Sequence, residues 1–117
     1  MTLGEIAQKL SLLSLTPEQE SDRLAEVSAG HASDLLSEVL AHAPPGGLLV
    51  TVQVHLNVIA VSMHAELRAV IFAGGIMPEE SVRQKAMDEG LILYSTNEST
   101  FDIVGRLYAL GLRGKCA

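Results

Sequence analysis

His31, His55 and Asp34 are the residues of this sequence whose types best suit acid–base or metal chemistry. A histidine beside a carboxylate can transfer a proton, and imidazole nitrogens together with a carboxylate oxygen can hold zinc. His31 and His55 each follow an apolar segment, so we expect both in loops at the ends of successive strands. Their spacing matches no zinc-binding motif, and no nucleophile in a strained turn accompanies them. We therefore expect no catalytic residue and no bound metal; an enzyme that uses these three residues is the less favoured alternative.

The spacing of the glycines shows whether the sequence contains a phosphate-binding motif of a phosphoryl-transfer enzyme. A P-loop requires G-x-x-x-x-G-K-[ST], in which backbone N–H groups hold the phosphates. Gly114-Lys115 is followed by Cys116, and Ala109 stands where the first glycine would be. Gly74-Gly75 lacks the G-x-G-x-x-G spacing of dinucleotide-binding loops. The sequence predicts neither kinase chemistry nor a cofactor.

The net negative charge of the chain argues against two classes of binding partner. The chain has 117 residues, with 8 Lys and Arg against 14 Asp and Glu, and a formal net charge of −6. An acidic chain repels the phosphates of nucleic acids and the head groups of anionic membranes. Aromatic residues make up only 3% of the chain, so stacking platforms for single-stranded nucleic acid are missing as well. We expect no nucleic acid and no membrane among its partners.

Length and composition predict one folded domain in the cytoplasm. Hydrophobic residues make up 48% of the chain, which suffices for a core and excludes intrinsic disorder. A single cysteine, Cys116, permits neither an internal disulfide nor a cysteine zinc cluster. The N-terminal residues lack the pattern of a secretory signal. Residues 39–65 contain no Asp, Glu, Lys or Arg, but the Pro-Pro-Gly-Gly sequence at 44–47 interrupts them, so we expect no membrane-spanning helix.

Apolar runs and helical patterns alternate along most of the chain. Thr2 and Glu5 have the spacing of a capping box and predict a helix over residues 2–10. A polar loop is expected at residues 18–23. Gly and Pro residues end or begin several of the later segments. The predicted strands are residues 12–15, 24–29, 48–54, 69–73 and 91–95, and the predicted helices are residues 33–42 with Ser33 as N-cap, 57–67 with Asn57 as N-cap, 78–89 with Pro78 at the first helical position and Gly90 as its end, and 99–110 with Gly111 as C-cap.

Short continuous apolar strands separated by helices are typical of a parallel sheet that is covered on both faces. We expect a single α/β domain of three layers, in which helices flank a short, mostly parallel sheet of four to five strands. Within this domain, spanning residues 1–117, an N-terminal helix and loop occupy residues 1–23, a βα core occupies residues 24–112, and residues 113–117 form a tail.

The predicted helix at residues 57–67 is apolar around most of its circumference. A helix on the outside of a small domain normally keeps a polar stripe. We expect its outer side to pack on a second copy of the chain, since exposed apolar patches of this size mark interfaces. The alternative is that the N-terminal helix covers it within one chain. The candidate residues of the homodimer interface are Val58, Ile59, Val61 and Met63.

Small and polar residues gather in the loops that follow the predicted strands. They suit a pocket for a polar small molecule, but the same residue types form caps and turns, and the sequence leaves both interpretations open. Asp34, Glu79 and Glu98 stand near the starts of helices and would repel an added anion, so an anionic ligand would lie near His55 and Asn57. The candidate ligand-binding residues are Gly30, His31, Ser33, Asp34, Gln53, His55, Asn57, Gly74, Gly75 and Thr96.

Four segments of the sequence, taken together, resemble a known family. Residues 30–37 (GHASDLLS), 50–58 (VTVQVHLNV), 69–75 (AVIFAGG) and 90–96 (GLILYST), with Ser99-Thr100-Phe101, are similar to a DRTGG domain. More closely, they resemble the small stand-alone relatives of the N-terminal domain of HPr kinase/phosphorylase. The resemblance extends from the N-terminal helix to about Leu112, although no Asp-Arg-Thr-Gly-Gly string occurs.

The resemblance implies a compact α/β fold and a regulatory or accessory role. Domains of this family occur beside nucleotide-sensing CBS domains and in some phosphotransacetylases, and they tend to dimerise. The kinase activity of the HPr enzyme does not carry over, because this chain has no P-loop. We therefore predict a non-enzymatic regulatory domain that forms a homodimer and binds a small ligand or a partner enzyme. A purely structural dimerisation module is the alternative.

Overall fold

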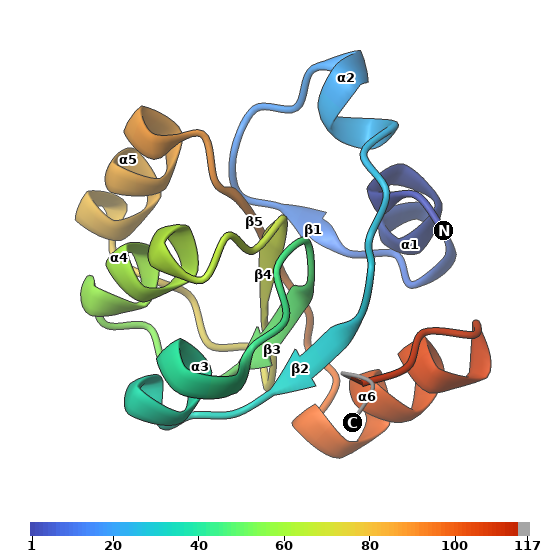
Figure 1. Ribbon diagram of the computed structural model, residues 1–117. Helices are drawn as coiled ribbons and strands as arrows, with labels where there is room; N and C mark the ends of the chain where they lie inside the picture. The colour runs from blue at the N-terminus through green and yellow to red at the C-terminus, as the bar shows by residue number, and fades with distance from the viewer. Residues whose placement is uncertain (115–117) are drawn as a thin grey trace.

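Five short strands form one sheet in the computed structural model, which describes residues 1–114 (Figure 1). Their order across the sheet is β1-β5-β4-β3-β2; β2 to β5 run parallel, and β1 is antiparallel to β5. All residues of β3, β4 and β5 are buried, because helices cover both faces. The mostly parallel sheet is as predicted. The strands are β1 (Leu13–Ser14), β2 (Gly30–Ala32), β3 (Leu48–Thr51), β4 (Ala69–Phe72) and β5 (Ile92–Ser95).

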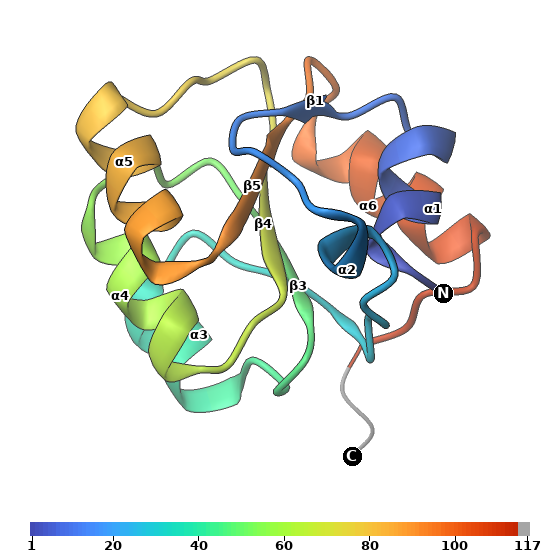
Figure 2. The same ribbon diagram turned by 90° about the horizontal axis from the view of Figure 1, so that it is seen from above.

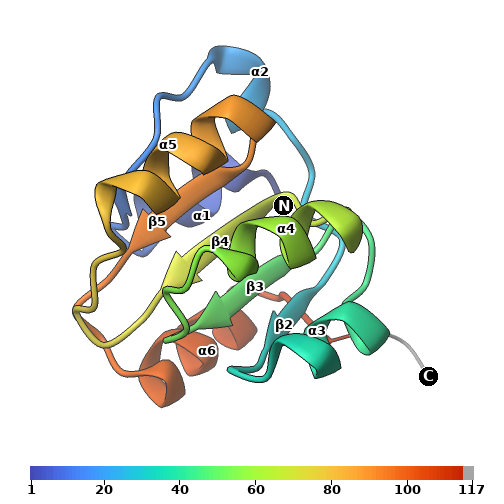
Figure 3. The ribbon, with the colours of Figure 1, turned by 90° about the vertical axis from the view of Figure 1, so that its left-hand side faces the viewer.

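Helices make the two outer layers and confirm the three-layer α/β prediction. The helices that connect the parallel strands lie on one face of the sheet (Figure 3). This follows because consecutive strands are neighbours in the sheet and each connection between them is a right-handed crossover. The last helix returns on the opposite face, where the N-terminal helix also lies (Figure 2). On the first face are α3 (Leu36–His42), α4 (Asn57–His64) and α5 (Glu80–Glu89); on the other are α1 (Leu3–Lys9), the single-turn α2 (Glu20–Arg23) and α6 (Thr100–Ala109).

Each face of the sheet has its own hydrophobic core. Leu3 and Ile6 of α1, with Ile103 of α6, pack on the side of the sheet that presents Tyr94. The second core lies under α3, α4 and α5 and includes Phe72. Among residues 1–114, no helix is long and apolar enough to cross a membrane.

Caps fix several helix ends as the sequence predicts. The side chain of Thr2 accepts from the Glu5 backbone N–H, and the Glu5 side chain accepts from the Thr2 backbone, so the capping box is complete. Ser99 caps α6 through the Asp102 backbone N–H. Gly90 ends α5 with a φ of 76°, in the left-handed region where glycine has no steric penalty.

Several predicted boundaries are wrong. Residues 24–29 are not a strand: Val27 donates to the Met1 carbonyl, and the parallel strand begins at Gly30. The polar loop at 18–23 contains the helical turn α2. Residue 35, not Ser33, is the N-cap of α3, and Pro78 precedes the N-cap of α5 instead of occupying its first position.

The helix at residues 57–67 ends early. Leu56 is its N-cap in place of Asn57, and its last residue is His64. Glu66 then turns the chain with a φ of 59°, and Leu67 donates to the Ser62 carbonyl. This turn leads the chain directly into β4.

The predicted tail begins with an ordered contact. Gly30 N donates to the Arg113 carbonyl over 2.8 Å, so the chain at Arg113 lies along the outer edge of β2. Residues 115–117 of the predicted tail, Cys116 included, lie outside the described residues.

Candidate functional site

Asp34 joins two neighbouring strand ends. Its Oδ1 accepts from Thr51 Oγ1 over 2.9 Å and from the Val52 backbone N–H over 2.8 Å. Thr51 is fully buried at the end of β3. Asp34 therefore lies before α3 and outside it, although the helix was predicted over residues 33–42, and its carboxylate holds the loop after β2 against β3.

Gln53, His55 and Asn57 form a turn in which side chains hydrogen-bond to backbone N–H groups of the same turn. Gln53 Oε1 accepts from the His55 backbone N–H over 3.2 Å, and His55 Nδ1 accepts from the Asn57 backbone N–H over 3.0 Å. Because Nδ1 is the acceptor, a neutral His55 carries its proton on Nε2. These bonds favour the interpretation of these residues as turn-forming.

Ser33 and Thr96 behave in the same way. Ser33 Oγ accepts from the Leu35 backbone N–H over 3.2 Å, and Thr96 Oγ1 accepts from the Glu98 backbone N–H over 3.2 Å. Short side chains with an oxygen commonly make such local bonds in turns. Both hydroxyls thus act within their own loops.

His31 pairs with Glu38, not with Asp34. Its Nε2 lies 2.8 Å from Glu38 Oε1, across the connection from β2 to α3. The hydrogen bond with His31 holds the pKa of the Glu38 carboxyl below its ordinary value, and Ser33 adds to the effect. His31, Asp34 and His55 therefore have three different partners. Among residues 1–114, no group of three or more His, Cys, Asp or Glu is placed to hold a metal ion.

Gly74 and Gly75 lie where the connections from neighbouring strands leave for opposite faces, the usual ligand crevice of an open parallel sheet. Both have positive φ, 75° and 73°. Gly74 N donates to the Glu98 carbonyl over 2.7 Å, and Gly75 N donates to the Thr96 carbonyl over 2.9 Å. These two N–H groups tie the loops after β4 and β5 together and are therefore not free to bind a phosphate.

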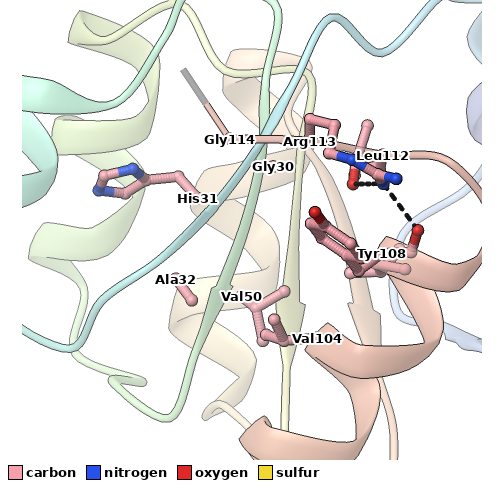
Figure 4. A pocket seen from close by; sticks show the side chains of 10 residues that line it. Gly30, His31, Ala32, Val50, Val104, Tyr108, Leu112, Arg113 and Gly114 are labelled. Atoms are coloured by element: carbon pink, nitrogen blue, oxygen red, sulfur yellow. Dashed lines mark hydrogen bonds between the residues drawn. The ribbon is translucent and has the colours of Figure 1, made fainter. Parts of the chain in front are cut away.

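A small apolar cavity lies where the edge of β2 meets α6 (Figure 4). Its volume is about 180 Å³. A Cβ on Gly30 would lie 3.0 Å from Leu112 Cδ2, so glycine permits the close approach of Leu112 here. The imidazole of His31 points away from the cavity in Figure 4, toward the α3 side. The lining residues that shape it are Ala32, Val50, Val104, Leu107, Tyr108 and Leu112.

Arg113 supplies the positive charge at this cavity. Its guanidinium carbon lies 3.6 Å from the centroid of the Tyr108 ring, a cation–π contact. Nη1 donates to the carbonyls of Tyr108, over 2.8 Å, and Leu112, over 3.1 Å. The cavity thus combines apolar walls with an aromatic ring and an anchored cation.

Of the residues that line this cavity, only Gly30 and His31 are candidates from the sequence, because Arg113 falls in the predicted tail. The sequence-based prediction also missed large apolar side chains that are exposed beyond the carboxyl ends of the parallel strands. Phe101, in the first turn of α6, is 87% exposed. Its position in the first turn, one residue beyond Thr100 and the capping Ser99, is the only signal that could have indicated this exposure. The others are Leu35, Leu56, Ile76 and Met77.

Two of the four predicted interface residues are wrong. Val58 and Ile59 are fully buried in this chain's own core, on the side of α4 that packs on the sheet. They are therefore not available to a partner. Val61 and Met63 are partly buried and pack at the margin of that core.

The described geometry defines an open α/β domain whose polar strand-end residues stabilise loops, with a separate apolar cavity beside α6. No protein-family model matches the sequence, and no curated protein matches it. The fold, however, is similar to a solved structure of the CBS and DRTGG domains in the regulatory region of a Clostridium perfringens pyrophosphatase, crystallised with the activator diadenosine tetraphosphate. The TM-score is 0.75 at 15% identity, over 96% of this chain and 47% of that one.

This chain spans about half the length of that regulatory region. At 15% identity the similarity concerns the fold, and it supports the DRTGG-like architecture that the sequence motifs predicted.

Proposed function

We propose that this chain is a non-enzymatic regulatory domain that binds a small ligand and acts as a homodimer, in the cytoplasm. The observation that carries the proposal is the fold similarity, over 96% of the chain, to a regulatory region crystallised with a nucleotide activator. A partner enzyme is the alternative occupant of the ligand site. A module that only dimerises is the alternative function.

The hydrogen bonds of the candidate catalytic groups support a non-enzymatic role. Asp34 Oδ1 is engaged by Thr51 and Val52, and His55 Nδ1 by the Asn57 backbone. A general base must instead reach a substrate proton. This part of the proposal would be contradicted by an enzymatic activity of the chain that His55→Ala abolishes and that a substitution away from these residues leaves intact.

The cavity between β2 and α6 is the proposed ligand site. Its volume of about 180 Å³ is below the roughly 300–1,000 Å³ typical of pockets for drug-sized molecules. It therefore suits one base of a nucleotide, or a group of similar size, with the rest of the ligand outside the cavity. Arg113 and the Tyr108 ring favour a ligand that combines an aromatic ring with an anionic group, as a nucleotide does.

Thermal shift against adenine and guanine nucleotides tests the ligand site. At a ligand concentration of 100 times Kd, binding stabilises the folded state by about 2.7 kcal/mol, which raises Tm by several degrees. Ala32→Leu fills the cavity from an exposed position and should abolish the shift. Ala60→Leu, an exposed alanine on α4, is the matched control and should keep it. If no nucleotide stabilises the wild type, the ligand proposal fails.

Sedimentation tests the homodimer. Met63→Glu places a charge on the partly exposed side of α4 and should shift the chain to monomers. Phe101→Glu carries the same charge at the carboxyl ends of the strands and should leave the dimer intact. If Phe101→Glu alone dissociates it, the interface lies at the strand ends. A wild type that is monomeric at working concentration contradicts dimerisation.

A further inference from the structure

A second, polar depression is lined by residues of α1, of β1 and of α2 and the segments beside them. Figure 2 shows α1 and α2 on the same side of the sheet as α6. Its volume is about 460 Å³. Tyr94 of β5 forms its base, Glu18 and Arg23 stand beside it, and Ala7 and Leu12 add apolar wall. None of these residues belongs to the cavity beside Arg113 or to the strand-end loops.

Tyr94 places a buried hydroxyl beside Glu18 at this depression, without a hydrogen bond of good geometry to it. The residue is 1% exposed, and its Oη makes no hydrogen bond within residues 1–114. A buried polar group that is left unpaired costs about 1–3 kcal/mol, so such groups mark places where a polar partner is expected. Burial raises the pKa of the Tyr94 phenol, and the nearby Glu18 carboxylate raises it further, so the group is a neutral O–H donor at physiological pH.

Glu18 and Arg23 are paired only loosely. Arg23 Nη1 lies 3.5 Å from Glu18 Oε2, and Ser14 Oγ lies 3.4 Å from Glu18 Oε1. Both distances exceed the 2.7–3.2 Å that is typical of good hydrogen bonds. The Glu18 side chain is 12% exposed and that of Arg23 is 51% exposed. A mostly buried carboxylate and an accessible guanidinium therefore retain capacity for donors and acceptors, respectively.

Gly4 holds this arrangement in place. A Cβ at Gly4 would lie 3.0 Å from the Arg23 carbonyl oxygen and 3.1 Å from Arg23 Cβ. Only glycine lets α1 approach α2 this closely. The position of Arg23 beside the depression thus depends on a glycine of α1, the helix that supplies Ala7 to the lining.

We propose that this depression binds a free α-amino acid, with its ammonium group on Glu18 and its carboxylate on Arg23 and the Tyr94 hydroxyl. A ligand with only one charge would meet an uncompensated like charge on one of these two side chains. An α-amino acid carries both charges on groups bonded to the same carbon, which matches two opposite side chains about 3.5 Å apart. The binding mode is independent of the nucleotide site proposed above.

Isothermal titration with each proteinogenic amino acid tests the proposal. We expect at least one to bind saturably. The amide of the best binder lacks the carboxylate, and its deamino analogue lacks the ammonium group. Since a charged hydrogen bond contributes about 1.5–3 kcal/mol, each analogue should bind about tenfold more weakly or worse.

Variants assign the binding to these side chains. Arg23→Gln and Glu18→Gln should each weaken it about tenfold or more, and Tyr94→Phe, which keeps the ring in the core, should weaken it several-fold. Tyr108→Phe is the matched control and should leave it unchanged, as should the cavity-filling Ala32→Leu. Absence of binding by every amino acid overturns the proposal, as does an unchanged affinity in Tyr94→Phe and Arg23→Gln. A crystal structure with only an ordered water on Tyr94 Oη, under saturating amino acid, would overturn it as well.

Discussion

His31 Nε2 and Glu38 Oε1 lie 2.8 Å apart and link the edge strand β2 to the first turn of α3. The same carboxylate lies where the helix dipole favours negative charge. A single side chain therefore stabilises the start of the helix and fastens it to the strand that precedes it.

This pair predicts a loss of stability in acid. The pKa of Glu38 is lowered in the folded state, so its contribution is complete above the ordinary value of 4.5 and disappears as pH falls through the lowered pKa. Glu38→Gln should lower the free energy of unfolding at pH 6, and its difference from the wild type should vanish in acid. Urea unfolding at a series of pH values measures this. Glu66→Gln, beyond the end of α4, is the control; a difference that does not change with pH would contradict the assignment.

Two helical glycines predict opposite effects of one substitution. Gly4→Ala places a methyl group 3.0 Å from the Arg23 carbonyl oxygen and should destabilise the fold by about 1–3 kcal/mol. A Cβ at Gly105, in the exposed part of α6, meets nothing within 4 Å. Gly105→Ala should therefore stabilise the fold by up to about 1 kcal/mol. Thermal unfolding of both variants compares them; equal effects would show that helix propensity alone decides.

The central strands were predictable because both of their faces are buried. Continuous apolar runs such as Ala69–Phe72 leave little choice of structure. β2 was missed because an edge strand needs no apolar run, and Gly30–Ala32 is only partly buried. The position of β2 is set by β3 on one side and by the Arg113 carbonyl on the other. Arg113 lies near the C-terminal end of the described chain. Such a contact leaves no local pattern.

The strand-end residues could be located but not interpreted from the sequence. Asp34 and His55 lie near strand ends as expected, although Asp34 precedes α3 instead of belonging to it, and turns and pockets use the same residue types. Hydrogen-bond partners decide between the two, and Thr51 is such a partner only because β3 lies beside the loop after β2. The cavity at Tyr108 was not predictable, since its walls come from distant segments whose apolar residues each resemble ordinary core.

Burial of Tyr94 predicts the alkaline limit of the fold. Its pKa is raised in the folded state, so its neutral form contributes stability that is complete below the ordinary value of 10.0 and is lost as pH rises above it. In a Tyr108→Phe background, Tyr94 is the only tyrosine, as the chain has 2. We expect phenolate absorbance to appear only together with unfolding, followed by circular dichroism. Ionisation near pH 10 in a folded chain would contradict the raised pKa of Tyr94.

Two substitutions of Asp34 distinguish the contribution of its acceptor oxygen from that of its negative charge. Asp34→Ala leaves the buried Thr51 hydroxyl and the Val52 N–H without their acceptor, and should cost about 1–3 kcal/mol of unfolding free energy. Asp34→Asn keeps an oxygen at the Oδ1 position and should retain most of the stability, because both donors can still be satisfied. Urea unfolding of the two variants measures the difference. If Asp34→Asn is as destabilised as Asp34→Ala, the negative charge matters more than the acceptor, and the assignment of Asp34 to the loop contact alone is wrong.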